Sequence, residues 1–186
     1  MTSSSSAGPR GRRFWRRRHV ESHPRAEDEG RVLRELARLD PWSVWAARVR
    51  EDEVGDVAVV GTTGAFLISI VGLEGYLAGK GERLTVDGRP IEGLRGLRKA
   101  ARKAHHRLGA AAVFTDVVPI LCLTRAITGS PRTVKDVRVV RLEDLVGEIV
   151  NRERSLRPSR AEKGVRVLGD PLPRAQGARP DIEDET

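Results

Sequence analysis

Hydrophobic positions recur with two different periods along the middle of the chain. Over residues 27–39 they recur every three to four positions, which predicts an amphipathic helix that ends at Asp40-Pro41. Residues 90–108 show the same spacing over a longer segment, and residues 142–150 predict a third helix. The apolar stripe of the longer segment consists of Leu94, Leu97, Ala101, Ala104 and Leu108.

Short apolar runs bounded by turn residues predict strands between these helices. Residues 57–60 and 65–71 flank Gly61-Thr62-Thr63-Gly64, a sequence that favours a hairpin turn. The remaining predicted strands cover residues 44–49, 83–86, 112–114, 117–123 and 137–140. The alternation of strands and helices predicts an α/β fold, with helices on both faces of one sheet.

The two ends of the chain differ from this middle part in composition. A length of 186 residues predicts one domain with extensions. We predict a basic disordered tail over 1–26, a domain over 27–153 and a Pro-rich, mixed-charge tail over 154–186, in which 164–168 could form a short added strand. In the first tail, arginines flank Phe14-Trp15 and suit contacts with phosphates or with a membrane surface: Arg12, Arg13, Arg16 and Arg17.

Charge and composition narrow the choice of partner. With 34 Lys and Arg against 26 Asp and Glu, the net charge of +8 favours nucleic acid, acidic lipid or an acidic protein. Arginine greatly outnumbers lysine, which indicates a GC-rich, bacterial genome and makes part of the basic excess compositional. The single cysteine, Cys122, excludes an intramolecular disulfide. The uncharged stretch 57–73 is shorter than the ~20 residues of a spanning helix and contains the glycine turn, so we expect no membrane span and a cytoplasmic protein.

A strand-opening acid, a glycine in a hairpin turn, an apolar strand and a later glycine follow one another at Asp56, Gly64, Phe66, Ile68 and Gly75. This pattern resembles the centre of the nuclease-related domain (NERD) family, which is similar to restriction-endonuclease-like nucleases with a PD-(D/E)-x-K site. Glu29 stands where the family has an acid in its first helix. The resemblance covers about residues 27–150 and implies a restriction-endonuclease-like mixed central sheet flanked by helices.

The residues that would carry the family's chemistry are mostly missing. Such a site implies carboxylates that hold a divalent cation and a lysine that positions water. The positions that match Glu-x-Lys are Ser69-Ile70-Val71, so the strand carboxylate and the lysine are lost at Ser69 and Val71. Glu29 and Asp56 would be residual acids of the site. We therefore expect no catalytic residue, no metal and no cofactor.

The predicted helix over 90–108 carries the best candidate for binding. Its polar face is strongly basic and could follow a phosphate backbone, or could simply be a solvated face: Arg95, Arg98, Lys99, Arg102, Lys103 and Arg107. The adjacent His105 and His106 do not share one helical face, so a joint metal site is not expected.

Three functional hypotheses remain open at this stage. The first is a catalytically degenerate nuclease-related domain that binds nucleic acid phosphates without sequence preference. The second is a protein-interaction or membrane-surface module on the same fold. The third is a metal-dependent nuclease whose site residues have moved to Glu74 or Lys80, and only this one requires Mg²⁺. The oligomeric state is left open by the sequence.

Overall fold

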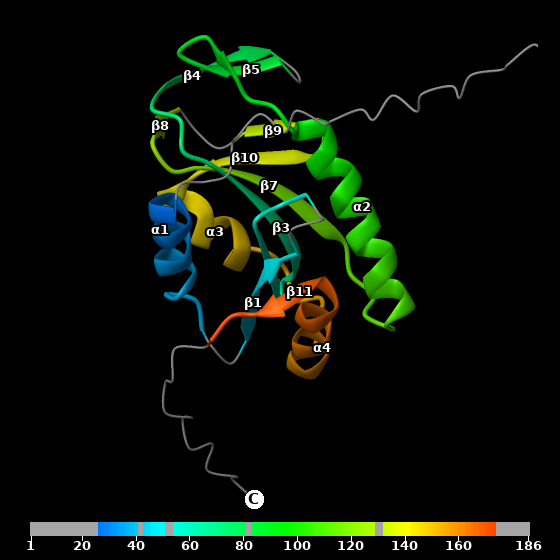
Figure 1. Cartoon of the computed structure of the whole chain (residues 1–186). Coiled ribbons are helices and arrows are strands. Elements are labelled where there is room, and N and C mark those ends of the chain that lie inside the picture. The colour runs from blue at the N-terminus through cyan, green and yellow to red at the C-terminus, as the bar shows by residue number, and fades with distance from the viewer. Residues whose placement is uncertain (1–25, 41–42, 51–53, 81–82, 129–131, 174–186) are drawn as a thin grey trace, which may run out of the picture.

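The computed structural model describes residues 26–40, 43–50, 54–80, 83–128 and 132–173 (Figure 1). The predicted basic tail, with Arg12, Arg13, Arg16 and Arg17, lies outside the described residues, as does the segment from 174 to 186. Among the described residues, no helix is long and apolar enough to cross a membrane.

The described residues form a seven-stranded mixed sheet in the order β11-β1-β2-β3-β7-β10-β9. The three strands β1, β2 and β3 pair in antiparallel fashion, whereas β3, β7 and β10 run parallel to one another. The predicted α/β class and mixed sheet are therefore confirmed. The strands of this sheet are β1 Val44–Val49, β2 Val57–Gly61, β3 Gly64–Val71, β7 Val117–Leu123, β9 Arg132–Val134, β10 Val137–Arg141 and β11 Gly169–Pro171.

Helices cover both faces of this sheet (Figure 1). On one face lie α1 (Ala26–Leu36) and α3 (Leu145–Val150), the latter preceded by the short 3₁₀ turn η1 (Leu142–Asp144). On the other face lie α2 (Leu94–Ala110) and α4 (Pro158–Leu168). Because side chains alternate along a strand, β3 supplies both cores: its residues Phe66 and Ile68 pack under α1 and α3, and Leu67 packs under α2 and α4.

A second, small sheet follows β3 in the order β6-β5-β4-β8. Its strands are β4 Gly75–Lys80, β5 Arg83–Val86, β6 Arg89–Pro90 and β8 Ala126–Ile127. The predicted strand over 83–86 is confirmed. The strand β4 was not predicted, because its glycines and its polar ends weaken the apolar alternation that indicates a strand.

The predicted strand over 112–114 is wrong. This segment ends helix α2 instead: Ala112 has a positive φ of 57°, and the Val113 amide donates to the Leu108 carbonyl at 2.9 Å. Val113 is buried, so its apolar character reflects a hydrophobic contact that secures the helix end.

The predicted domain end at residue 153 is also wrong, since residues 158–171 belong to the domain. Ala161, Val165 and Leu168 are buried along one face of α4, and β11 pairs antiparallel with β1. The expected added strand at 164–168 is helical, and the strand begins only at residue 169. The prolines of this segment misled the prediction because each occupies a position that needs no amide donor: Pro158 starts a helix, and Pro171 lies on an edge strand.

Candidate functional site

The residual acid Glu29 lies on α1 and is bound to an arginine. Its Oε1 accepts hydrogen bonds from the Nε and Nη2 atoms of Arg48 on β1, at 3.0 and 2.6 Å. A carboxylate held in this way by a guanidinium is already charge-compensated, so it is a poor ligand for a cation.

The second residual acid, Asp56, supports the backbone of the β2–β3 hairpin. Its Oδ2 accepts the amide of Ile70 at 2.6 Å, and its own amide donates to the Ile68 carbonyl at 2.8 Å. These bonds continue the pairing of the two strands beyond the last ladder pair, Val57 with Ile68. Asp56 and Glu29 thus have different partners on different elements.

The two lost positions lie on β3, at the parallel boundary with β7. Ser69 is half-buried opposite Leu121, and Val71 is half-buried opposite Leu123. Val71 also packs against the apolar cluster under α2, so its side chain belongs to the core.

A buried acid that the sequence analysis did not select lies next to Glu29. The Asp28 side chain is fully buried, and its Oδ1 accepts hydrogen bonds from Thr124 Oγ1 at 2.7 Å and from Arg125 Nε at 2.8 Å. Burial by itself raises the pKa of Asp28, but the hydrogen bonds from Arg125 and Thr124 outweigh burial and leave that pKa below its ordinary value. A signal for it exists in the sequence, because Asp28 stands four positions before Val32 and eight before Leu36 on the buried stripe of α1.

Arg125 lies two residues after the end of β7, and it binds three carboxylates. Besides Asp28, its guanidinium contacts Glu27 Oε2 at 2.8 Å and Glu74 Oε1 at 3.1 Å. These hydrogen bonds raise the pKa of Arg125 above its ordinary value. We call Glu27, Asp28, Glu74 and Arg125 the acidic cluster. The positive charge in this cluster is the guanidinium of Arg125, a side chain of the protein itself.

Gly72 makes the acidic cluster possible. A side chain at this position would overlap the Asp28 carboxylate, so only glycine allows α1 to bring a buried acid so close to the end of β3. The absence of a side chain at residue 72 thus serves the ion pair rather than a turn.

The residues present do not fit a Mg²⁺ site. In the parts of the chain that the structure describes, no group of three or more His, Cys, Asp and Glu residues is arranged to hold a metal ion. The proposed replacement Glu74 is bound to Arg125, and Lys80 lies at the end of β4 in the small sheet. A cation that approached these acids would have to displace a guanidinium.

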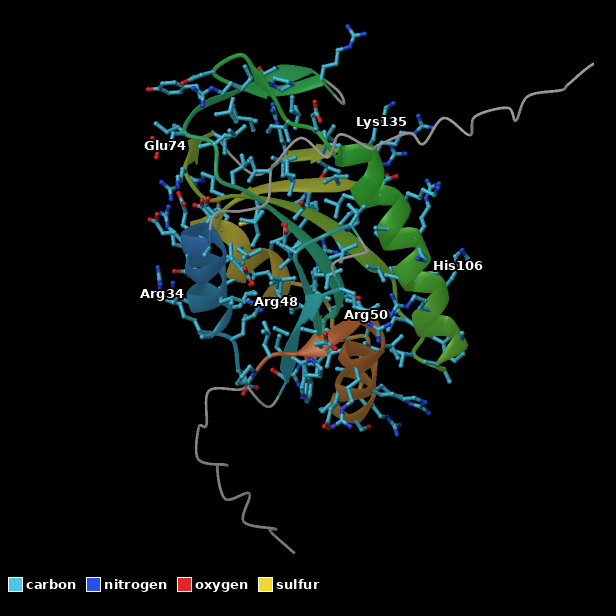
Figure 2. All side chains as sticks on the ribbon, viewed as in Figure 1. Arg34, Arg48, Arg50, Glu74, His106 and Lys135 are labelled. Carbon is cyan, nitrogen blue, oxygen red and sulfur yellow. The ribbon has the colours of Figure 1, made fainter. Side chains whose placement is uncertain are left out.

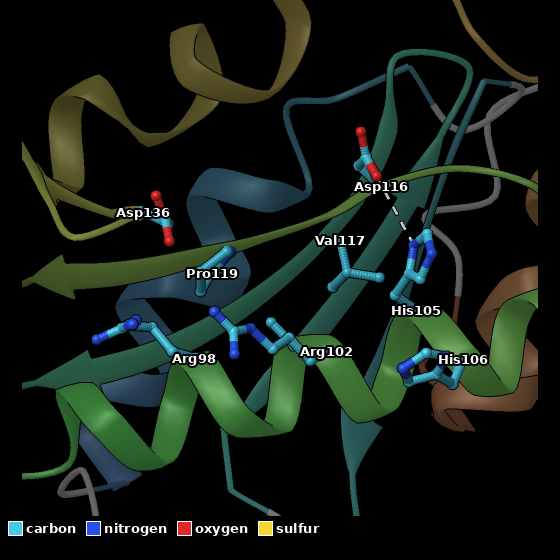
Figure 3. Close-up of a pocket in the computed structure, with 9 residues that line it drawn as sticks. Arg98, Arg102, His105, His106, Asp116, Val117, Pro119 and Asp136 are labelled. Carbon is cyan, nitrogen blue, oxygen red and sulfur yellow. Dashed lines mark ion pairs between the residues drawn. The ribbon is translucent and has the colours of Figure 1, made fainter.

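The basic helix α2 borders a separate groove of about 490 Å³ (Figure 3). Arg98 and Arg102, one helical turn apart, extend from α2 toward β7, where Val117 and Pro119 line the opposite wall. Two acids also line the groove: Asp136, near Arg98, and Asp116, beside His105. The full lining is Arg98, Ala101, Arg102, His105, His106, Asp116, Val117, Pro119 and Asp136.

His105 is fixed at one end of this groove. Its Nδ1 lies 3.0 Å from the Thr115 carbonyl and 3.7 Å from Asp116 Oδ1. The neighbouring His106 also lines the groove, and the two rings meet edge to face with centroids 5.8 Å apart. The histidines thus share a groove, but no third ligand makes them a metal site in the described chain.

The structure divides the predicted basic residues into those in the groove and those beside it. Arg98 and Arg102 line the groove, whereas Arg95, Lys99 and Lys103 are exposed elsewhere on the same helix. Arg107 has a structural role, because its Nη2 donates to the Val167 carbonyl and so ties α2 to α4. The helix contains no acidic residue over its 17 positions, so cations continue along roughly 25 Å of surface.

The groove and the acidic cluster are distinct sites. Figure 2 shows Glu74 of the cluster and His106 of α2 on opposite sides of the molecule. The cluster joins α1 to the ends of β3 and β7, whereas the groove lies on the opposite face of the sheet, between α2 and β7. The acids that would define a nuclease site and the cations that would bind phosphate therefore do not meet.

No protein-family model matches the chain, and no curated protein and no solved structure matches it either.

Proposed function

We propose that this protein is a catalytically degenerate nuclease-related domain that binds nucleic acid through its phosphates and does not cleave it. The observation that carries the proposal is the α2 groove, in which Arg98 and Arg102 face β7 on a helix without acids. Arginine donates to phosphate oxygens in a fixed, bidentate geometry, and the exposed Arg95 and Lys99 extend the cationic surface along the helix.

The state of the acids supports binding without cleavage. Hydrolysis of a phosphodiester by this class of site needs a metal-held water. Glu29 is bound to Arg48, and Asp28 and Glu74 are bound to Arg125, so each of these carboxylates is already held by a guanidinium. We therefore also expect that added Mg²⁺ or Mn²⁺ produces no cleavage of nucleic acid.

Binding of this kind has a defined salt dependence. If Arg95, Arg98, Lys99 and Arg102 each neutralise one phosphate of a duplex, log K should fall with log salt with a slope of about −3.6. Phosphate contacts carry no sequence information, so oligonucleotides of different sequence should bind equally. The tail arginines Arg12, Arg13, Arg16 and Arg17 would add to this slope in the full chain.

The test is a fluorescence-anisotropy titration of a labelled 20-base-pair duplex with the full chain at several salt concentrations. We expect the double variant Lys99→Gln/Arg102→Gln to bind at least about tenfold more weakly and to reduce the slope by about 2. The control is Arg38→Gln in the turn that follows α1, where the arginine is also exposed but lies on the other face of the sheet. An unchanged slope in the double variant would refute the assignment to α2.

A plasmid incubation completes this test. Wild-type protein with Mg²⁺, with Mn²⁺ and with chelator should retard the plasmid and leave it intact in all three conditions. Metal-dependent nicking that disappears in Asp56→Ala would instead establish a relocated active site. A shortened protein that tests the contribution of the tails should span residues 26–173, because a fragment that ended at residue 153 would lack α4 and β11.

One observation favours the second hypothesis, a protein-interaction module. Tyr76 and Ile127 are paired residues of β4 and β8, and 66% and 57% of their surface is exposed. Two large apolar side chains side by side on a small sheet suit contact with a protein. This reading gains weight if the titration shows no binding to nucleic acid, and binding to anionic vesicles instead would favour a membrane-surface module.

A further inference from the structure

The α2 groove contains features that duplex phosphates alone would not require. Part of its lining is apolar, because Ala101 comes from α2 while Val117 and the buried Pro119 come from β7. Its volume of about 490 Å³ lies within the range of sites that enclose a small organic group. A rigid duplex presents phosphates to a surface, whereas a flexible strand can also insert a base.

An exposed aromatic residue lies on the segment that joins α2 to the groove-lining strand β7. Phe114 is 78% exposed and lies two residues before Asp116, which lines the groove. Its neighbours hold the backbone in place: Val113 is buried, and the Thr115 carbonyl contacts His105. Because the backbone around Phe114 is anchored, the stacking of a base on its exposed ring costs little additional conformational entropy.

The acids that line the groove are a further feature that duplex phosphates would not require. Asp116, whose side chain is 98% exposed, and Asp136 would repel phosphates, yet both line the same groove as Arg98 and Arg102. Carboxylates accept hydrogen bonds from the exocyclic amino groups of bases. In a duplex the Watson–Crick edges that carry these groups are paired, so carboxylates suit a strand whose bases are unpaired.

We propose that the groove binds single-stranded nucleic acid in preference to duplex. Arg98 and Arg102 hold the phosphates, Phe114 stacks on a base, and Asp116 accepts a hydrogen bond from a base edge. This inference rests on the proposed binding function and specifies its substrate class.

The experiment compares a fluorescein-labelled 15-nucleotide strand of mixed sequence with the duplex formed from it, both titrated with the full chain at 150 mM salt. We expect the wild type to bind the single strand at least about tenfold more tightly than the duplex. The variant Phe114→Ala should lose roughly 5- to 100-fold in affinity for the single strand and change its affinity for the duplex by less than about twofold. The variant Phe114→Trp should retain the single-strand affinity, because it preserves a stacking surface.

The matched control is Tyr76→Ala, which removes another exposed aromatic side chain, on the small sheet. This variant should bind both probes as the wild type does. Equal loss from Phe114→Ala and Tyr76→Ala, or a Phe114→Ala variant that keeps the full wild-type preference for the single strand, would overturn the inference.

The outcomes separate this inference from the function on which it rests. If Arg102→Gln weakens both probes while Phe114→Ala weakens neither, phosphate binding stands and the single-strand preference fails. If the wild type binds neither probe, both fail.

Discussion

Replacement of Asp28 by alanine tests whether the acidic cluster is a fixed ion pair of the core. The substitution removes a fully buried carboxylate that accepts hydrogen bonds from Thr124 and Arg125. Breaking a buried ion pair from one side costs about 3–5 kcal/mol. Arg125 keeps its contacts to Glu27 and Glu74 in the variant, so we expect the low end of this range, about 3 kcal/mol of the free energy of unfolding.

The matched control is Glu27→Ala, which removes the adjacent acid from the same guanidinium. The Glu27 side chain is 68% exposed, so its ion pair with Arg125 contributes only about 0–1 kcal/mol. Urea denaturation followed by circular dichroism gives both free energies of unfolding from midpoint and slope. Similar losses in the two variants would refute the argument that burial, rather than the number of ion pairs, decides the strength of this contact.

The pH dependence of a second variant at this position, Asp28→Asn, gives an independent check. Because the folded-state pKa of Asp28 lies below its ordinary value, its ionised form stabilises the fold above the unfolded pKa of about 3.9. That stability is lost as the pH falls through the lower, folded-state pKa. The stability difference between the wild type and Asp28→Asn should therefore be greatest above about pH 4 and should shrink in more acidic solution. A difference that is constant down to pH 2 would contradict this assignment.

Three further predictions concern packing. Leu168→Ala should lower the free energy of unfolding by about 2–5 kcal/mol, whereas Lys163→Ala, on the exposed face of the same helix, should change it by less than about 0.5 kcal/mol. Equal urea midpoints for the two variants would instead support the prediction that this segment is a tail. Gly72→Ala should destabilise the protein, since the added methyl group overlaps the Asp28 carboxylate, and a melting temperature equal to that of the wild type would show that α1 can shift. Burial raises the pKa of Cys122 to about 12, so a thiol reagent at pH 8 should label the protein only in urea, and rapid labelling of the folded protein would place this thiol at the surface.

The basic helix and the β2–β3 hairpin could be predicted because their signals are local. Residues three and four apart must share a helical face, so the apolar stripe from Leu94 to Leu108 implied a basic opposite face. In the same way, a turn with two glycines between two apolar runs favours antiparallel pairing, and β2 and β3 pair in this manner.

The candidate site was only partly predictable. Arg98 and Arg102 were selected because they lie on the basic face, but the sequence did not show that β7 forms the other wall of their groove. Glu29 and Asp56 were selected through a family resemblance, yet the fully buried acid is Asp28, which precedes Glu29. The resemblance itself stays a prediction, and Asp28 is buried because it shares the helical face of Val32 and Leu36 on α1.

The periodic elements of this protein and its excess of positive charge follow from the sequence alone, because periodicity depends on the order of residues and net charge on their number. The tertiary structure decided which charges meet. Arg125 lies 97 positions after Asp28 and contacts it only because β7 ends beside the start of α1. It also decided that residues 158–171 belong to the core, since a proline-rich segment becomes helix and strand only where Val60, Leu108 and β1 offer it an apolar surface and an open sheet edge. Such contacts arise from the folding of distant segments onto one another, and no local pattern encodes them.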